Sequence, residues 1–385
     1  GAGWAPQACR HESVMSVQER IDAVPDLDAP AWWPDGSPPM PGREVTGPQA
    51  WYGADMAKTD EWIYTLSPAE IFEIDTALES VKDRADDLLN VTKEDFPLPT
   101  FGPVIEDLRH EILFGRGFTL IRGLEIERYT KREAAVVFWG VGRHFGEPRS
   151  QNGKGHLLGH VHDLGNDVGN PGHRGYQTTI ELTHHTDSTD IAGLMCLRPA
   201  KSGGESSLVS STTIHNEMLR RRPDLVEELF KPFHVDRREE IPEGKLPYYL
   251  MPVFNWHRGK LSGFYSWLQV EIASRHPGVP ALTDKQREAA AMIHELAWEP
   301  RINLMTSFKP GDMQLVHNHT IFHSRTAYED WDEPDRKRHL LRLWLCPPVA
   351  RELPVQFTGR YGGIAVGDRG GIRVPGVPLK APLDP

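Results

Sequence analysis

The chain has 385 residues, and its 43 Lys and Arg against 54 Asp and Glu give a formal net charge of −11. This acidic balance argues against a nucleic-acid-binding protein with a broad basic surface, and the 35 Gly and 32 Pro argue against a helical bundle. There is no apolar run of about 18 residues, no signal-peptide pattern at the start and no cysteine framework among three cysteines. We therefore expect a cytoplasmic protein whose partner is a small-molecule substrate, with no nucleic acid and no membrane. A homo-oligomer is compatible with these features.

Helices are predicted at four places in the chain. Residues 1 to about 65, rich in Pro and Trp, precede them and predict an extended arm over the main body. Three capping boxes, Ser67 to Glu70, Thr130 to Glu133 and Thr283 to Gln286, each precede apolar residues at helical spacing. A fourth helix is expected over about 213–230.

Short strands are predicted between these helices, separated by turns that contain Gly and Pro. They cover residues 118–121, 177–185, 191–197, 207–210, 302–306, 313–316 and 340–346. Many short strands with long excursions indicate a jelly-roll or barrel and not a parallel βαβ sheet.

A candidate metal site lies in the segment Thr183-His184-His185-Thr186-Asp187. On a strand, residues two apart share a face, so His185 and Asp187 can meet at one metal ion while His184 points away. With a distant second histidine they would form the 2-His-1-carboxylate set that holds Fe(II) and leaves open positions. Histidines 317, 319 and 323 are the candidates, and spacing alone does not choose among them. The same H-x-D pattern at His234 predicts only a strand that leads into a solvated turn.

Other polar residues near these segments are candidate cofactor or substrate contacts. Arg338 and Arg342 enter an apolar strand and need anionic partners there, for which a structural salt bridge is the simplest explanation. Near the metal segment, Tyr176, Gln177 and His184 are candidate substrate contacts. His160 lies in a separate histidine-rich run, where it is either a further substrate contact or part of a hydrogen-bonded strand edge.

Taken together, these motifs resemble the TauD/TfdA family of Fe(II)- and 2-oxoglutarate-dependent dioxygenases. The resemblance covers roughly residues 100–348 and depends on His185-Thr186-Asp187, the 197–206 segment with its Gly-Gly-acid turn, the 318–325 run and the terminal arginine strand. It implies a mainly β fold with flanking helices around a double-stranded β-helix (jelly-roll) core. We expect a single catalytic domain over 99–350, an N-terminal arm and helix over 1–98 that packs on it, and an irregular tail over 351–385.

The resemblance also implies roles for individual residues. Iron would be held by His185, Asp187 and His323, where His323 ends the family's N-x-x-x-x-H pattern. Arg342 would pair with the far carboxylate of 2-oxoglutarate, Arg338 would lie near its other carboxylate, and Ser206 would help to hold the same cosubstrate.

The implied reaction uses Fe(II), 2-oxoglutarate and O2 and releases succinate and CO2. Its default outcome is hydroxylation of an unactivated C–H bond in a small polar organic acid or amino-acid-like substrate. Desaturation, cyclisation and C–heteroatom cleavage remain open, whereas the carboxylate of Asp187 argues against halogenation because it fills the position that a halide would need. Two other classes also remain open at this point: a zinc-type hydrolase on the same ligands, and a jelly-roll binding protein without catalysis.

Overall fold

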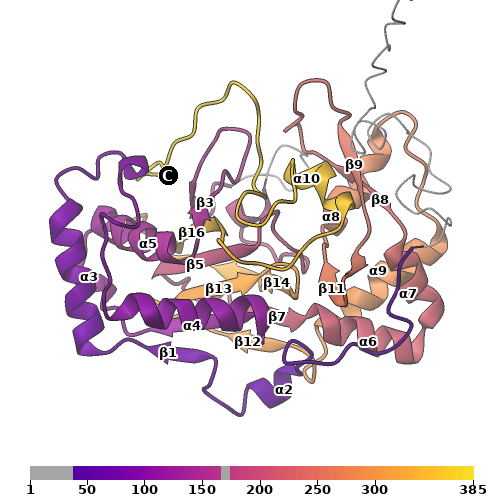
Figure 1. The fold of residues 1–385 in the computed structure, drawn as a ribbon, viewed down its shortest axis with the longest axis horizontal. Helices are drawn as coiled ribbons and strands as arrows, with labels where there is room; N and C mark the ends of the chain where they lie inside the picture. Colours follow the sequence, from indigo (N-terminus) through magenta and orange to yellow (C-terminus); the bar gives the residue numbers. More distant parts are fainter. Residues whose placement is uncertain (1–37, 166–173) are drawn as a thin grey trace, which may run out of the picture.

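Two β-sheets form the centre of the computed structural model, which describes residues 38–165 and 174–385 (Figure 1). The larger sheet has the strand order β1 (Ile63–Thr65), β2 (Phe118–Arg122), β13 (Met313–His317), β5 (Ile191–Arg198), β16 (His339–Cys346) and β3 (Glu147–Pro148), and β4 (Leu158–Val161) also pairs with β16. The smaller sheet has the order β12 (Leu304–Thr306), β7 (Ser206–Ser210) and β14 (Ile321–Arg325). The predicted jelly-roll core with flanking helices is therefore confirmed.

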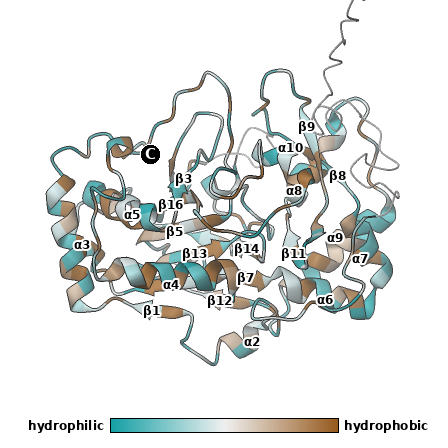
Figure 2. Cartoon of the chain, viewed as in Figure 1, coloured by the Kyte–Doolittle hydropathy of each residue, from teal (hydrophilic) through white to brown (hydrophobic). Residues whose placement is uncertain are grey.

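Alternation along the strands divides the larger sheet into two faces. Leu341, Leu343 and Leu345 of β16 belong to the apolar cluster shared with helix α5 (Lys131–Phe145). Their neighbour Trp344 belongs instead to a cluster that joins the larger sheet to residues of the smaller one, such as Leu208. The strands of this core are largely apolar in Figure 2. One face of the sheet thus lies under helices, and the other faces the second sheet.

The three capping boxes form as predicted. They begin α3 (Pro68–Val81), α5 and α9 (Asp284–Ala297), each with both reciprocal hydrogen bonds. The predicted helix over 213–230 is two helices, α6 (Ser211–Arg221) and α7 (Pro223–Phe230). Since a residue before proline disfavours the helical region, the chain breaks at Arg222, with φ −145° and ψ 70°.

One long helix, α4 (Phe101–Phe114), was not predicted. Its N-cap residue Thr100 makes no side-chain capping bond, and Gly102-Pro103 in its first turn is typical of a loop. The cap comes from another helix, because the Glu73 carboxylate of α3 accepts hydrogen bonds from the backbone N–H of Thr100 and Phe101, at 2.7 and 2.8 Å. A cap supplied from 27 residues away leaves no local pattern in the sequence.

The predicted strand over 177–185 is wrong. The segment begins with a short 3₁₀ helix, η3 (Gly175–Gln177), and then runs irregularly beside β14. Only Leu182 and His185 bond to the backbone of that strand.

The remaining elements lie around this core. They are α2 (Gly53–Met56), η1 (Leu88–Asn90), η2 (Ile126–Arg128), β6 (Ser202–Gly203), β8 (Phe233–Asp236), β9 (Tyr248–Met251), β10 (Phe254–His257), β11 (Lys260–Gly263), α8 (Trp267–Ile272), η4 (Ala273–Arg275), β15 (Tyr328–Glu329), η5 (Val355–Phe357) and α10 (Thr358–Tyr361). In the part of the chain that is described, no helix is long and apolar enough to cross a bilayer.

The two ends of the chain contribute to the body of the molecule. Trp51 and Trp62 of the predicted arm are buried against Phe118, whereas Trp4, Trp32 and Trp33 lie outside the described residues. The last 35 residues, yellow in Figure 1, contain little regular structure and run back over the ends of the strands.

Candidate metal centre and its cavity

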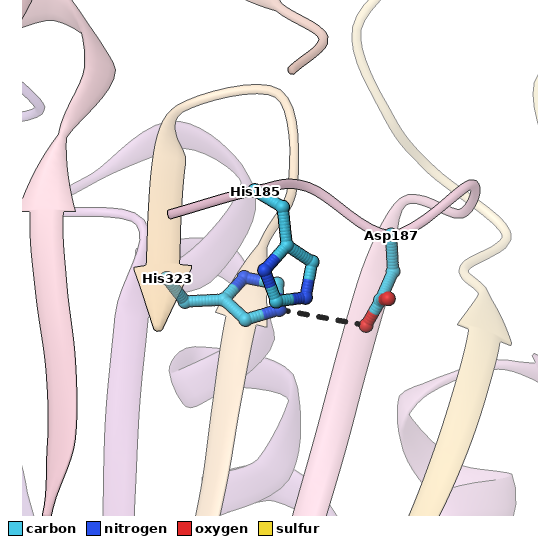
Figure 3. A group of neighbouring side chains, drawn as sticks. All are labelled: His185, Asp187 and His323. Carbon is cyan, nitrogen blue, oxygen red and sulfur yellow. Dashed lines mark ion pairs between the residues drawn. The ribbon is translucent and has the colours of Figure 1, made fainter. Parts of the chain in front are cut away.

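His185, Asp187 and His323 come together at one end of the smaller sheet (Figure 3). Each offers one ligand atom, and the three atoms all lie within 4.8 Å of one another. The imidazole rings of His185 and His323 have centroids 4.5 Å apart, and His323 Nε2 lies 3.6 Å from Asp187 Oδ2. This is the spacing expected when three side chains converge on one ion.

Backbone pairing places these side chains. His185 and His323 are directly opposite each other and exchange two hydrogen bonds, of 2.9 and 3.0 Å, which brings their side chains together. The backbone N–H of Asp187 donates to Asn318 Oδ1 at 2.8 Å. The asparagine of the N-x-x-x-x-H pattern therefore fixes the loop that carries Asp187.

The protonation states of His185 and Asp187 suit a divalent cation. His185 Nδ1 donates to the carbonyl of Thr183 at 2.8 Å, which leaves Nε2 as the lone-pair donor. Burial and the neighbouring His323 lower the pKa of His185 to about 4, so the ring is neutral near pH 7. Burial opposes ionisation of Asp187, but Arg342 and His323 outweigh it and lower the pKa of that carboxyl well below its usual range.

These residues fit Fe(II). Two imidazoles and one carboxylate on the same side of an ion leave its other positions open. His323 Nδ1 is buried and has no hydrogen-bond partner among the described residues. No hydrogen bond at Nδ1 therefore fixes the His323 ring, and the backbone of β14 sets its position.

The other two candidate histidines belong to a separate buried network. His317 Nε2 lies 3.1 Å from His319 Nδ1, and His319 Nε2 lies 3.0 Å from the Tyr361 hydroxyl. The nearby carboxylate of Asp190 is held by Arg369 through two hydrogen bonds, of 3.0 and 2.6 Å, with both side chains fully buried. Hydrogen bonding already accounts for this group, so His323 alone of the three lies with His185 and Asp187.

The second H-x-D pattern, at His234, also has a structural explanation. His234 lies on β8 and a turn at residues 238–239 follows, as expected, and Asp236 at the end of the strand is fully buried. Its carboxylate accepts from Arg275 at 2.8 Å and lies 2.7 Å from His276 Nε2.

Arg342 and Arg338 line the cavity onto which the three candidate ligands open. Arg342 Nη1 lies 3.9 Å from Asp187 Oδ1, its Nε donates to Gln151 at 2.8 Å, and its guanidinium lies 4.3 Å from the ring centre of Tyr176. Arg338 lies against Tyr328, 5.0 Å from its ring centre, and its buried Nη1 has no partner in the described structure. The two guanidiniums therefore differ in their distance from the metal ligands.

The predicted substrate contacts are only partly placed in the cavity. Tyr176 lines it. Gln177 follows in η3 but is outside the lining formed by the described residues. His184 contradicts the expectation, because its side chain points away, with Nε2 2.7 Å from Ser207 Oγ and its ring against Trp298. The direction of His184 agrees with the alternation expected on an extended chain.

Of the two alternatives for His160, the structure shows the hydrogen-bonded strand residue and not the substrate contact. It pairs with Leu341, on the face of the larger sheet opposite the cavity. Its ring bonds to His339 at 2.9 Å and to the Pro382 carbonyl at 2.7 Å. Strand alternation therefore removes it from the site.

Ser206 occupies an intermediate position. It is buried on β7, and its hydroxyl donates to Gln314 Oε1 at 2.9 Å. Gln314 lines the cavity, and its Nε2 is buried without a partner among the described residues. Ser206 is therefore connected to the cavity through its hydrogen bond to Gln314.

Sequence reasoning gave no role to Arg325, which ends β14 and lines the same cavity. It also missed three further arginines of that lining, Arg174, Arg238 and Arg360. They come from the residue before η3, the turn after β8 and helix α10. No local pattern distinguishes them from surface arginines.

Comparisons with known proteins identify the family. The model of the taurine catabolism dioxygenase TauD, TfdA family matches residues 82–344. FR-33289 synthase from Streptomyces rubellomurinus is 32% identical over 330 residues, which cover 83% of this chain and 96% of that protein. Two solved structures share the fold and each cover 74% of this chain and 93% of their own: an asparagine oxygenase (TM-score 0.57, 14% identity) and the non-heme iron oxygenase OrfP with Fe and alpha-ketoglutaric acid (TM-score 0.55, 17% identity).

The family match spans more than half of the chain and includes every candidate metal ligand. It removes the hydrolase and the non-catalytic binding protein as alternatives. The chain belongs to the TauD/TfdA family and is an Fe(II)- and 2-oxoglutarate-dependent oxygenase.

Proposed function

We propose that this enzyme hydroxylates an unactivated C–H bond of a small polar organic acid or amino-acid-like substrate and converts 2-oxoglutarate to succinate and CO2. The observation that carries the proposal is the opening of the 2-His-1-carboxylate group onto an arginine-lined cavity. The asparagine oxygenase with a similar fold was solved with 3-hydroxyasparagine and succinate, which supports hydroxylation with succinate as co-product.

In this proposal His185, Asp187 and His323 hold Fe(II). When bound, iron together with 2-oxoglutarate and O2 supplies the oxidant that attacks the C–H bond. The protein keeps the ligands in the required states: the Thr183 carbonyl fixes the tautomer of His185, and Asn318 fixes the Asp187 loop.

We further propose that the two core arginines have the opposite roles to those that the family resemblance implies. If 2-oxoglutarate chelated the metal through its keto group and adjacent carboxylate, that carboxylate would lie beside the metal ligands. Arg342 is the arginine at this position, 3.9 Å from Asp187. The far carboxylate would then lie farther from the metal, and Arg338, which lines the same cavity without an ion pair to Asp187, would be its partner.

The surroundings of Arg338 support an anion there. Arg325 is close by, and burial together with repulsion from Arg338 lowers the pKa of Arg325 to about 10. Each of the two guanidiniums has a buried Nη1 without a partner among the described residues. Burying two like charges with unused donors is unfavourable unless an anion binds between them.

Ser206 is proposed to position the cosubstrate indirectly. Because its hydroxyl occupies the carbonyl oxygen of the Gln314 amide, the Gln314 N–H groups point elsewhere and remain available as donors.

Two measurements test the proposed function. Anaerobic addition of Fe(II) and 2-oxoglutarate should produce a visible metal-to-ligand charge-transfer band. Turnover under ¹⁸O2 with a panel of organic and amino acids should then give succinate and a product that has gained one labelled oxygen. A product that has lost two hydrogens would replace hydroxylation by desaturation, and absence of the band would refute the assignment of the ligands.

A further inference from the structure

One arginine on the cavity wall, Arg360, has no role in holding iron or 2-oxoglutarate. It lies in α10, in the segment that follows β16, so it belongs to neither core sheet. It lines the cavity onto which the three candidate metal ligands open. Because the proposed function assigns Arg338 and Arg342 to 2-oxoglutarate, Arg360 is available for a different ligand.

Helix α10 is bonded to the residues that follow the candidate ligand Asp187. Arg360 Nε donates to Ser188 Oγ at 2.8 Å, and the hydroxyl of Tyr361 donates to the Thr189 carbonyl at 3.3 Å. Ser188 and Thr189 come directly after Asp187 in the chain. The partner of the Arg360 guanidinium is thus the neighbour of a candidate metal ligand, and a group bound to Arg360 would have its nearest carbon atoms beside the metal centre.

No carboxylate of the described residues pairs with the positive charge of Arg360. The residue is 8% exposed, its Nε partner is a neutral hydroxyl, and its guanidinium lies 5.5 Å from the ring centre of Tyr249. Neither Nη group donates to a described residue, yet neither is enclosed by protein, so both can be reached from the cavity. A guanidinium in this state is costly to bury unless an anion binds to it.

Two other buried arginines of the C-terminal segment have structural roles. Arg369 donates two hydrogen bonds to the carboxylate of Asp190, at 3.0 and 2.6 Å. Arg351 Nη1 donates to the Leu261 carbonyl at 2.7 Å. Both use an Nη group within the protein, and neither lines the cavity formed by the described residues. Arg360 differs from them in both respects, which indicates a ligand in addition to the contact with its own chain.

The free donors of Arg360 match a carboxylate. A guanidinium offers one edge that includes Nε and a second edge formed by the two Nη groups. Ser188 occupies Nε, so the second edge remains available. Two parallel N–H groups on this edge can each donate to one oxygen of a carboxylate, and the planar shapes of the two groups agree.

We propose that Arg360 binds a carboxylate of the primary substrate through its two Nη groups, and that it selects this acid over neutral and tetrahedral analogues. This inference rests on the proposed function and names the residue outside the core sheets that recognises the substrate. The hydrogen bond to Ser188 orients the guanidinium for this contact.

The test compares three probes that share one carbon chain: 4,4,4-trifluorobutanoate, 4,4,4-trifluorobutanamide and 3,3,3-trifluoropropanesulfonate. Their common trifluoropropyl group is apolar, which suits Trp267 and Leu268 in the cavity lining. The full-length protein is first saturated with 2-oxoglutarate and with Zn(II), a diamagnetic replacement for Fe(II), so that the core arginines are occupied. Binding of each probe at pH 7.5 is then followed by fluorine NMR.

We expect the carboxylate to bind more tightly than the sulfonate and at least about tenfold more tightly than the amide, because a charge-assisted contact is lost in the amide. A sulfonate affinity equal to or above that of the carboxylate would overturn the assignment to a carboxylate. Equal affinities for the carboxylate and the amide, or no binding of either, would overturn the anion site itself.

Variants locate the binding to Arg360. Arg360→Gln should reduce the affinity for trifluorobutanoate at least about tenfold and that for the amide less than threefold. Arg360→Lys keeps the charge but loses the planar fork, so it should still prefer the carboxylate to the amide but no longer to the sulfonate. Arg132→Gln, an exposed substitution on α5, should change none of these affinities. Thermal unfolding reports the fold, and an unchanged carboxylate affinity in folded Arg360→Gln would refute the assignment.

The two proposals fail separately. If the charge-transfer band with Fe(II) and 2-oxoglutarate forms and Arg360→Gln leaves the carboxylate affinity unchanged, the proposed function stands and this inference falls. If the band does not form, the proposed function falls, while the same titration of the metal-free protein and of its Arg360→Gln variant still decides whether Arg360 binds a carboxylate.

Discussion

Arg338→Gln should weaken 2-oxoglutarate binding without removing the metal. Arg338 is buried, 4% exposed, and no described carboxylate pairs with it, so the substitution leaves no acidic partner unpaired in the free enzyme. We therefore expect the substitution to lower the affinity for 2-oxoglutarate and not the stability of the free enzyme. A charge-assisted interaction contributes about 1.5–3 kcal/mol, which corresponds to an increase of about 10- to 150-fold in the dissociation constant.

The assay uses two 2-oxo acids that differ only at the far end. Anaerobic titration of the charge-transfer band is carried out with 2-oxoglutarate and with 2-oxovalerate, which lacks the far carboxylate. Arg338→Gln should lose affinity for 2-oxoglutarate and not for 2-oxovalerate, whereas Arg342→Gln should weaken both because it lies beside the chelating carboxylate. The reverse pattern, with selective loss in Arg342→Gln, would refute our exchange of roles and restore those that the resemblance implies.

Three further predictions concern the metal centre and the buried histidines. His185→Ala or Asp187→Ala should abolish stoichiometric iron binding, while His184→Ala should retain it; equal iron loss in all three, measured by metal analysis, would contradict the placement of His184. Arg369→Gln should lower the free energy of unfolding by about 3–5 kcal/mol, because it leaves the Asp190 carboxylate buried and unpaired; a denaturant midpoint equal to that of the parent would refute this. Burial and the neighbouring His160 lower the pKa of His339 to about 3, so the contribution of His339 to stability is complete above about pH 6.5 and falls by about 1.4 kcal/mol for each pH unit below it, until pH 3; His339→Gln should make the loss of stability with falling pH less steep in urea titrations of the metal-free protein, and an unchanged slope would refute this.

The core of the fold could be predicted because its determinants are local. The three capping boxes and the alternating strands β5, β13 and β16 lie where the sequence pattern places them. Helix α4 could not be predicted, since its cap comes from Glu73 of another helix. The prediction of a strand over 177–185 was wrong for a related reason. Separate backbone hydrogen bonds to β14 position this segment, and they do not form a continuous β-ladder.

The candidate ligands could be proposed from the sequence, but not for the geometric reason first given. His185 and Asp187 do not share the face of a regular strand; His185 is placed by a single bridge to His323, and Asp187 by the Asn318 side chain. Choosing His323 over His317 and His319 required the family resemblance. The structure supplies the physical reason, because the other two histidines bond to each other and to Tyr361.

The roles of the arginines show where sequence reasoning ends. Arg338 and Arg342 lie in or next to β16, so an apolar strand with charges in it already marked them. Arg174, Arg238 and Arg360 lie on three separate excursions from the core, and only the folded chain brings them to one cavity wall. If the iron and 2-oxoglutarate chemistry that the family shares needs only residues of the two sheets, the segments outside the sheets can differ between relatives. We then expect the substrate to be recognised by those outer segments. Exchanging the charge of Arg360 should then alter which acid is oxidised while the 2-oxoglutarate band stays the same; a variant that loses both together would place Arg360 in the common machinery instead.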